Sequence, residues 1–354
     1  MPGFASRFDW LGGIPGAPAS DIKANRGTRN GRPGGSPLTA PTIAAIARPM
    51  KTNSEIPFEM VLAACAAEVE ALMERLLDGR TRAGEIVRPP RLMQAIRHGA
   101  LSGGKRLRPF LVVESAALFS VGGEAALRVA VALECVHCYS LIHDDLPAMD
   151  DDDLRRGLPT VHKAFDEATA ILAGDSLLTE AFAVLAGPET ELAAERKVAL
   201  VAALAAAAGA GGMAGGQAFD LEAERNTPDE QGIVTLQAMK TGALIRFAAE
   251  AGAIIAGASA EDRERLSSFG SAIGLAFQLA DDLLDLTSDA DTMGKATGKD
   301  AGRGKATLAA LHGVDWTRRQ LAGLVAQAND LLEPYGEAGN TLRAAARFVA
   351  ERRN

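Results

Sequence analysis

The sequence predicts an all-α protein, and three observations support this prediction. Ala and Leu dominate the apolar residues, aromatic residues make up only 5% of the chain, and runs of β-branched residues are few, a composition that favours helices over strands. Apolar residues recur at helical spacing from about residue 56 almost to the end of the chain, as at Val61, Leu62, Val69, Leu72 and Leu76. The pattern shows no strand–helix alternation and no repeat of fixed period. We therefore expect one large helical bundle.

Each predicted helix is a segment with this spacing. After the first, near 56–76, similar segments cover 105–121, 124–147, 165–186, 191–208, 230–256, 261–286, 305–312, 316–333 and 339–351. The stretch from Val198 to Gly216 holds no charged residue and is long enough to span a membrane. It is mostly Ala and Gly, however, and its glycines would loosen a spanning helix. We interpret it as a buried helix followed by a glycine-rich bend, and we expect no membrane span.

Residues 1–50 differ from the rest of the chain. They are rich in Gly, Pro, Ser, Arg and Ala and lack a helical period, so we expect a disordered N-terminal extension. Two alternatives stay open: a transit peptide, since the segment is mildly basic and poor in acids, or a true start at Met50. Residues 51–354 then form a single all-α domain, which is long enough to bury a large core.

The charge and the cysteines exclude several classes of protein. The net charge of −8 argues against a general nucleic-acid-binding protein, because the phosphate backbone requires a basic surface. Cys135 and Cys138 form a C-x-x-C, but the chain lacks the βαβ context of a redox motif and the second ligand pair of a zinc site. We expect these residues and Cys65 to be reduced core cysteines of a cytoplasmic protein.

A first acidic cluster follows the apolar stretch that ends at Ile142. It consists of Asp144, Asp145 and Asp150, and it is extended by Asp151, Asp152 and Asp153. Pro147 lies between the pair and Asp150, and a proline there should bend the backbone. We expect this bend to turn Asp150 toward Asp144, in spite of their awkward spacing.

A second acidic cluster, Asp281, Asp282 and Asp285, lies in an apolar helical stretch. Asp281 and Asp285 share one helix face, about 6 Å apart. Three carboxylates on a buried helix cost much free energy unless they are paired or bind metal. Such oxygen clusters suit Mg²⁺, which commonly bridges carboxylates to phosphates. The two clusters therefore predict several Mg²⁺ ions with one diphosphate between them.

Basic residues complete this predicted site. Lys105 and Arg108 lie at a predicted helix start, three residues apart, so they can point together. They would bind a diphosphate without metal, helped by the backbone amides of the helix N-terminus. Arg155 and Arg156 follow the first acidic cluster and can bind phosphate oxygens in a bidentate manner. His137 lies two turns before Asp144 on about the same face, and ligand and core roles are equally open for it.

Weaker signals come from the second half of the chain. Thr241, between Lys240 and a glycine, could kink its helix and free a carbonyl group. Gln278 lies three residues before Asp281 on the same face. Lys295 and Lys305 lie in a glycine-rich segment that is typical of a lid closing over phosphate.

Together these residues resemble the trans-isoprenyl diphosphate synthase (polyprenyl synthetase) family, with the closest similarity to bacterial farnesyl diphosphate synthases, over about residues 57–352. The motifs are GGKRLRP (103–109), SLIHDDLPAMDDDDLRRG (140–157), GGQAFDLE (215–222), KTG (240–242), GLAFQLADDLLD (274–285) and GKATGKDAGRGKAT (294–307). The resemblance implies the isoprenoid synthase fold, a large helical bundle around a central cavity, and a homodimer.

The resemblance also implies roles for individual residues. The expected cofactor is three Mg²⁺ ions, which Mn²⁺ can replace. They would be bound by Asp144, Asp145, Asp150, Asp281, Asp282 and Asp285. The allylic diphosphate would be bound by Arg155, Lys240, Thr241, Gln278, Lys295 and Lys305, of which the first four are also the expected catalytic residues. Isopentenyl diphosphate would be bound by Gly104, Lys105, Arg108, His137 and Arg156.

The resemblance further implies the reaction and its product. Tyr139 and Ser140, five and four residues before Asp144, would shape the floor of the pocket, with Tyr139 about 7.5 Å below Asp144 along the helix. A bulky ring at that position favours a C15 product, farnesyl diphosphate. The alternative is a geranylgeranyl diphosphate synthase with a C20 product.

Two further classes of protein fit the sequence less well. A class I terpene cyclase would carry an N-x-x-x-S-x-x-x-E metal motif, and this spacing is missing near 275–300. A non-catalytic regulatory partner of another synthase would be expected to have lost Asp or Arg residues from these motifs. All of them are present here.

Overall fold

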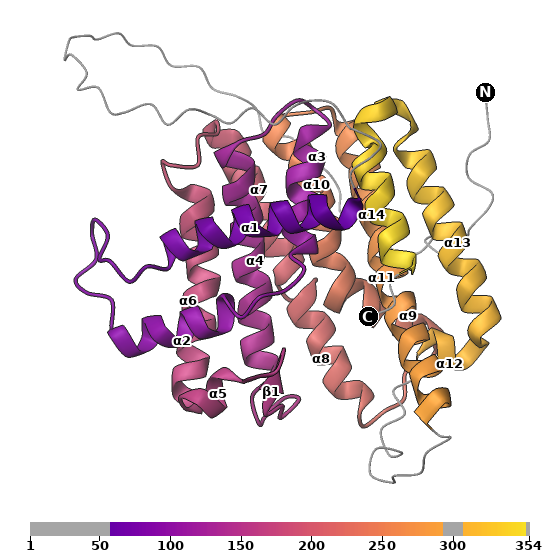
Figure 1. Ribbon diagram of the computed structural model, residues 1–354, viewed down its shortest axis with the longest axis horizontal. Helices are drawn as coiled ribbons and strands as arrows, with labels where there is room; N and C mark the ends of the chain where they lie inside the picture. The colour runs from indigo at the N-terminus through magenta and orange to yellow at the C-terminus, as the bar shows by residue number, and fades with distance from the viewer. Residues whose placement is uncertain (1–56, 293–306, 352–354) are drawn as a thin grey trace, which may run out of the picture. The chain divides into compact units, whose positions relative to one another are not determined.

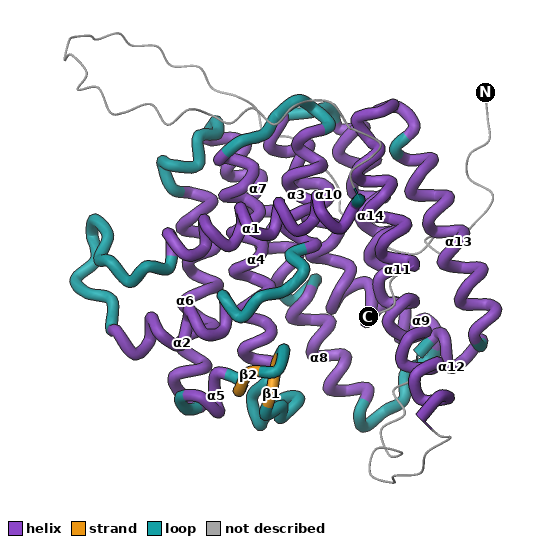
Figure 2. The backbone as a smooth tube through the Cα atoms, in the orientation of Figure 1, coloured by secondary structure: helices purple, strands orange, loops and turns teal. Residues whose placement is uncertain are grey.

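The computed structural model describes residues 57–292 and 307–351, with the backbone alone over 288–292. Most of this part is helical, and loops join the helices (Figures 1 and 2). In chain order the helices are α1 (Phe58–Leu76), α2 (Pro90–Ala100), α3 (Leu107–Ala117), α4 (Glu124–Asp144), α5 (Val161–Ala164), α6 (Glu167–Ala186), α7 (Ala194–Ala208), α8 (Met213–Ala223), α9 (Glu230–Gln237), the π-helix η1 (Ala238–Gly242), α10 (Ala243–Ala256), α11 (Ala260–Thr292), α12 (Leu308–His312), α13 (Val314–Leu331), the 3₁₀-helix η2 (Glu333–Gly339) and α14 (Asn340–Glu351). The all-α prediction is confirmed. The predicted extension 1–50, Lys295 and Lys305 lie outside the described residues.

The core of the bundle is built around α4 and α10. Helix α4 contacts α1, α2, α3, α6 and α10, and α10 contacts α3, α7 and α11 as well. Both helices are apolar on most of their circumference, which is the pattern of a helix enclosed by others. The first acidic cluster follows the end of the central helix α4, so the packing of the core fixes its position.

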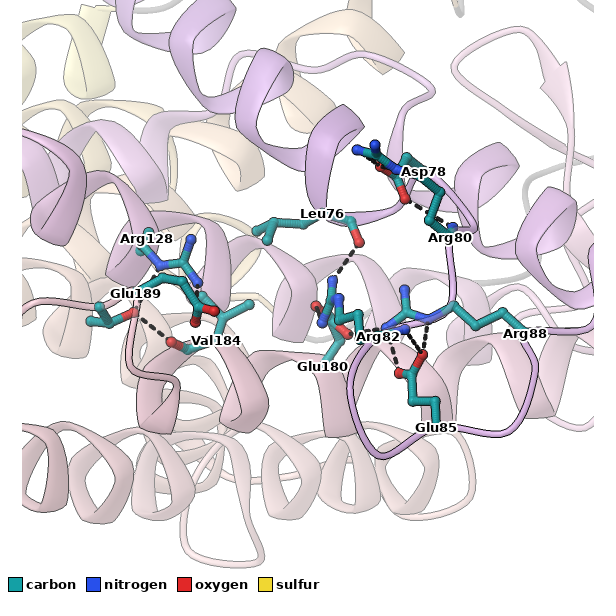
Figure 3. Close-up of polar contacts among 11 residues, drawn as sticks. Leu76, Asp78, Arg80, Arg82, Glu85, Arg88, Arg128, Glu180, Val184 and Glu189 are labelled. Atoms are coloured by element: carbon teal, nitrogen blue, oxygen red, sulfur yellow. Dashed lines mark hydrogen bonds and ion pairs between the residues drawn. The ribbon is translucent and has the colours of Figure 1, made fainter. Parts of the chain in front are cut away.

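Helices α1 and α2 lie across the bundle rather than along it (Figure 1). The loop between them is fastened to α6 by a network of charged side chains (Figure 3). Arg82 Nη1 lies 2.7 Å from Glu180 of α6, and Arg88 donates to both carboxylate oxygens of Glu85 at 2.8 and 2.7 Å. The sequence pattern did not predict α2 as a separate helix. Its first residue is Pro90, which suits the first turn because the missing N–H has no helical partner there.

A short hairpin interrupts the helices after the first acidic cluster. Strands β1 (Leu154–Arg155) and β2 (Leu158–Pro159) pair antiparallel through a two-residue turn at Arg156 and Gly157. Both turn residues have positive φ, at 55° and 78°, as a two-residue type I′ turn requires. The helical periodicity gave no sign of this hairpin, because its strands are two residues long.

Two other predicted elements differ from the structure. The glycine-rich bend after α7 is followed by a further helix, α8, where a bend alone was expected. The segment 230–256, predicted as one helix, is divided by the π-helix η1. Helix α8 and the π-helix η1 pack against each other. The helical periodicity did not predict either of them, because periodicity along the chain does not show which helices pack together.

Three stretches are long and apolar enough to cross a membrane, judged by length and composition only: α4, α6 and the pair of helices over 194–223. The α4 window is 67% buried within the bundle, whereas the α6 and 194–223 windows are only 39% and 33% buried. The expectation of a buried helix at the start of 198–216 is therefore wrong, because one face of α7 is exposed. Cys65, Cys135 and Cys138 are reduced cysteines buried in the core, which confirms the interpretation of the C-x-x-C as core residues.

Candidate active site

The first acidic cluster lies where α4 ends. Asp144 is the last residue of the helix and Asp145 is its C-cap. The backbone N–H of Asp150 donates to the carbonyl oxygen of Asp144 at 2.8 Å. The chain therefore folds back after Pro147, and the predicted return of Asp150 toward Asp144 is confirmed.

Asp144 and Asp145 have different electrostatic environments. Burial raises the pKa of Asp144 to about 6, and nearby Asp150 adds to the effect while Lys240 opposes it. Burial also raises the pKa of Asp145, but Arg155 opposes this because its Nε and Nη2 both donate to Asp145 Oδ1, at 2.7 and 2.6 Å. Arg155 thus neutralises Asp145, while Asp144 keeps a carboxylate that a cation would stabilise.

The second acidic cluster lies on α11 and shows a gradient of burial. Asp282 is buried, Asp281 is half-buried and Asp285 is exposed, so the expectation that all three carboxylates are buried is wrong for Asp285. Burial raises the pKa of Asp282 to about 6, although a hydrogen bond from Gln237 lowers it. Gln237 Nε2 donates to Asp282 Oδ2 at 2.9 Å across the space between α9 and α11. The sequence gave no reason to select Gln237.

The two clusters provide the ligands that a hard divalent cation takes. Asp144 and Asp282 are carboxylates that burial makes costly to ionise, and a bound cation would remove this cost. Within residues 57–287 and 307–351, no three His, Cys, Asp or Glu side chains lie close enough together to enclose one ion. Aspartate carboxylates are nonetheless the kind of ligand that Mg²⁺ takes, usually one or two of them together with phosphate oxygens.

Lys240, in the π-helix η1, lies near the first acidic cluster. Its Nζ donates to Asp220 of α8 at 2.6 Å, and its charge lowers the pKa of Asp144. Helix α8 approaches η1 closely at Gly216, where an added Cβ would lie 2.1 Å from the backbone nitrogen of Lys240. Asp220 belongs to the motif at 215–222, but its spacing in the sequence did not reveal its partner. Single π-turns occur often at functional sites. This one contains Thr241, at which the sequence predicted an irregularity in the helix.

The predicted basic residues converge on a second place. A cavity of about 180 Å³ is lined by Lys105, Arg108, His137 and Arg156, together with Phe277 and Phe348. We call it the basic cavity. Arg108 Nη1 lies 3.4 Å from His137 Nε2. Four of the five residues expected to bind isopentenyl diphosphate therefore line one cavity, although they come from three separate segments of the chain.

Burial keeps His137 in this cavity neutral. It lowers the pKa of His137 well below the ordinary value, and the neighbouring cations Arg108 and Arg156 lower it further. Burial also lowers the pKa of Arg108, and its Nε is buried without a hydrogen-bond partner. A neutral imidazole beside desolvated cations leaves the cavity with positive charge for an anionic ligand and one ring nitrogen for a hydrogen bond.

The fifth residue, Gly104, shapes the edge of the cavity. It has a φ of 130°, and an added Cβ would lie 2.8 Å from the guanidinium of Arg156. That guanidinium also donates to the carbonyl oxygen of Gly103. The hairpin turn sends Arg156 here, whereas its neighbour Arg155 binds Asp145. The expected division of the two arginines between two diphosphates is consistent with this geometry.

Arg106 was not predicted as a site residue, and the structure gives it an anchoring position. Its side chain is fully buried and its Nη1 donates to Glu134 of α4 at 2.6 Å, while Nη2 donates to the carbonyl oxygen of Ala100 at 2.9 Å. A second carboxylate, Glu70, lies 3.4 Å away. Because Arg106 is the N-cap of α3, this buried ion pair holds the loop that carries Lys105 and the start of the helix that carries Arg108.

The remaining predicted residues lie beside these groups. Gln278 is half-buried on α11, one turn before Asp281, and Thr241 is half-buried in η1. Tyr139 is half-buried on α4 and its ring meets His143 edge-on, with centroids 5.7 Å apart. The Ser140 hydroxyl donates to the carbonyl oxygen of His137 within the same helix.

A helical bundle with two acidic helix segments and a separate basic cavity defines the class of this protein, which has the isoprenoid synthase fold. A family model described as polyprenyl synthetase matches residues 89–335. The chain belongs to the polyprenyl synthetase family.

Individual relatives agree with this assignment. The chain is 42% identical to a farnesyl diphosphate synthase of Escherichia coli (strain K12) over 270 residues, which cover 74% of this chain and 89% of the relative. It is 37% identical to geranylgeranyl pyrophosphate synthase 9, chloroplastic, of Arabidopsis thaliana over 309 residues, 85% of this chain and 83% of the relative. Among solved structures, an FPP/GFPP synthase from Zymomonas mobilis in its apo form superposes with a TM-score of 0.74 at 44% identity and covers 83% of this chain and 98% of that one.

Proposed function

We propose that this protein is a farnesyl diphosphate synthase. It condenses isopentenyl diphosphate with dimethylallyl or geranyl diphosphate and releases farnesyl diphosphate and diphosphate. The observation that carries the proposal is the presence of two kinds of charged group: a basic cavity around Lys105 and Arg108, and two buried acidic clusters around Asp144, which has Lys240 nearby, and around Asp282. Two diphosphate substrates require two such sites, one with metal and one without.

The proposal assigns the acidic region to Mg²⁺, with three ions that Mn²⁺ can replace. Their ligands are the six aspartates of the two clusters: Asp144, Asp145, Asp150, Asp281, Asp282 and Asp285. When bound, the ions neutralise charge on the leaving diphosphate. The raised pKa values of Asp144 and Asp282, each about 6, support this assignment because buried carboxylates gain most from a cation.

The chain's own residues bind and orient the two substrates. Lys240 and Arg155, with Lys295 and Lys305, would bind the allylic diphosphate. Lys105, Arg108 and Arg156 would bind isopentenyl diphosphate, and the neutral His137 can donate a hydrogen bond to it. Fixed cations around both anions supply electrostatic stabilisation that needs no rearrangement during the reaction.

The reaction then follows from charge. The allylic C–O bond breaks and diphosphate leaves with the bonding electrons. The alkene of isopentenyl diphosphate attacks the resulting cation at C1 and forms the new C–C bond, and the departed diphosphate takes a proton from the product cation. Thr241 and Gln278 would face the developing cation, and the apolar surroundings keep water from it. This sequence needs no nucleophile from the protein.

The C15 product rests on Tyr139 and Ser140 as the floor of the pocket. The Tyr139 ring has limited freedom because it meets the ring of His143 edge-on. The names of several bacterial relatives support farnesyl diphosphate. A C20 product is the second candidate, favoured by the similarity to a plant geranylgeranyl pyrophosphate synthase.

The proposal includes a homodimer without a membrane span, located in the cytoplasm. The apolar windows of α6 and 194–223 are 39% and 33% buried, and α6 contacts α7. Leu172 on α6 is 54% exposed and Val198 on α7 is 68% exposed. A second copy of the chain would cover this apolar surface. Light scattering on the purified protein should give the mass of a dimer, and Leu172→Glu should give a monomer; binding to lipid vesicles instead would contradict the proposal.

Kinetics with two variants test the two-site function. Purified protein is assayed with Mg²⁺, isopentenyl diphosphate and geranyl diphosphate, and each substrate is varied in turn. Lys105→Ala should raise the KM for isopentenyl diphosphate, whereas Lys240→Ala should raise the KM for geranyl diphosphate. Equal effects of both variants on both KM values would contradict two separate sites, and a folded wild-type protein without condensation activity would favour the non-catalytic partner.

A further inference from the structure

The last helix of the chain forms part of the basic cavity. Phe348 and Val349 of α14 line it together with Lys105 of the loop before α3. The Lys105 ammonium lies over the Phe348 ring, with Nζ 5.8 Å from the ring centroid. This is within the distance at which an ammonium is attracted to an aromatic face.

The Phe348 ring is fixed from behind by other aromatic rings. Its centroid lies 5.0 Å from that of Phe58 on α1, and Phe58 meets Phe110 on α3 edge-on at 5.3 Å. Phe110 is fully buried and lies five residues after Lys105. The three rings therefore connect α14, α1 and α3, so the surface offered to Lys105 is rigid.

An aromatic partner suits a lysine that must bind an anion. A ring attracts the ammonium through its quadrupole and adds no charge of its own, so it can orient a lysine toward a diphosphate without adding a competing anion. A carboxylate partner holds a lysine in place through a direct hydrogen bond, as Asp220 does for Lys240 at 2.6 Å. Arg108 follows the same arrangement, because its guanidinium carbon lies 5.8 Å from the centroid of Phe277 on α11.

We propose that Phe348 is a positioning residue for isopentenyl diphosphate, because its ring holds the Lys105 ammonium in the basic cavity. This inference rests on the proposed function, in which the cavity binds that substrate. It gives α14 a role in substrate binding that no motif in the sequence indicates, since Lys105 and Phe348 are far apart in the chain.

The test compares Phe348→Leu, which keeps an apolar side chain without the ring, with Phe348→Tyr, which keeps the ring. Phe348→Leu should raise the KM for isopentenyl diphosphate by about 2- to 5-fold, the range for loss of a cation–π contact at an exposed site, because Lys105 is exposed. The KM for geranyl diphosphate and kcat should stay unchanged, and Phe348→Tyr should restore the wild-type KM. Val349→Ala is the matched control, because it removes volume from the same helix and cavity without changing the ring.

A double-mutant cycle separates positioning from packing. In a Lys105→Met background, Phe348→Leu should have no further effect on the KM for isopentenyl diphosphate. The same fold-change in both backgrounds, or equal effects of Phe348→Leu and Val349→Ala on both substrates, would overturn the inference. Thermal melting verifies folding, and Phe348→Met replaces the Leu variant if that variant does not fold.

The outcomes distinguish the inference from the proposed function. A wild-type enzyme that condenses both substrates, together with an unchanged KM in Phe348→Leu, would overturn the role of Phe348 alone. A folded wild-type protein that forms no product would overturn both.

Discussion

The buried ion pair between Arg106 and Glu134 should be the most sensitive point of the basic cavity. The Arg106 side chain is fully buried and that of Glu134 is 3% exposed, with 2.6 Å between Nη1 and Oε1. Glu134→Gln keeps the shape of the side chain but leaves the guanidinium charge in the core without its main partner. Breaking a buried pair in this way costs about 3–5 kcal/mol. At roughly 2 °C per kcal/mol for a domain of this size, the melting temperature should fall by roughly 6–10 °C.

Glu70→Gln is the matched control for this experiment. Glu70 also lies near Arg106, at 3.4 Å, but its side chain is 40% exposed, so water replaces the lost contact. Its removal should cost less than about 1 kcal/mol. Because Arg106 holds the loop that carries Lys105, Glu134→Gln should also raise the KM for isopentenyl diphosphate. If Glu134→Gln lowers the melting temperature no more than Glu70→Gln, the anchoring role of Arg106 is refuted.

Three further predictions concern the rest of the site. Tyr139→Ala should lengthen the product beyond C15, measured by sizing the dephosphorylated products; an unchanged product length would remove Tyr139 from the pocket floor. Asp220→Asn should raise the KM for geranyl diphosphate by about tenfold, because it removes a charge-assisted hydrogen bond that positions Lys240, and a similar rise for isopentenyl diphosphate would argue for general damage instead. The pKa of His137 is held below its ordinary value of about 6.5. Below about pH 6.5 the imidazole is therefore protonated in the unfolded chain while it stays neutral in the native protein. The stability of the native protein should decline as the pH falls through this range. In urea denaturation, His137→Gln should therefore lose less stability between pH 7 and pH 5 than the wild type, and equal losses would contradict a buried neutral His137.

The sequence predicted those parts of the site in which local spacing decides the geometry. Lys105 and Arg108 were expected to point together as residues three apart in one helix. Both line the basic cavity, but Lys105 precedes α3, which begins at Leu107, so the loop places Lys105 there and helix geometry does not. Asp150 returns toward Asp144 because Pro147 cannot continue the helix. The same reasoning identified His137, two turns before Asp144, as a candidate ligand.

The partners of these residues could not be predicted in the same way. Glu134 meets Arg106 only because α4 packs against the loop before α3, and Phe348 meets Lys105 only because α14 closes the cavity. These contacts join distant segments and depend on tertiary packing rather than on spacing along the chain. The exposure of Asp285 was missed for a similar reason, since the apolar residues around it did not show where α11 leaves the core.

The size of the product tests the central claim most directly. Purified protein is incubated with Mg²⁺, labelled isopentenyl diphosphate and geranyl diphosphate, and the products are dephosphorylated and sized by chromatography. The account predicts a C15 product that disappears when a chelator removes the metal. A C20 product would contradict the assigned pocket floor while keeping the mechanism, and the absence of any condensation product from folded protein would contradict the proposed function itself.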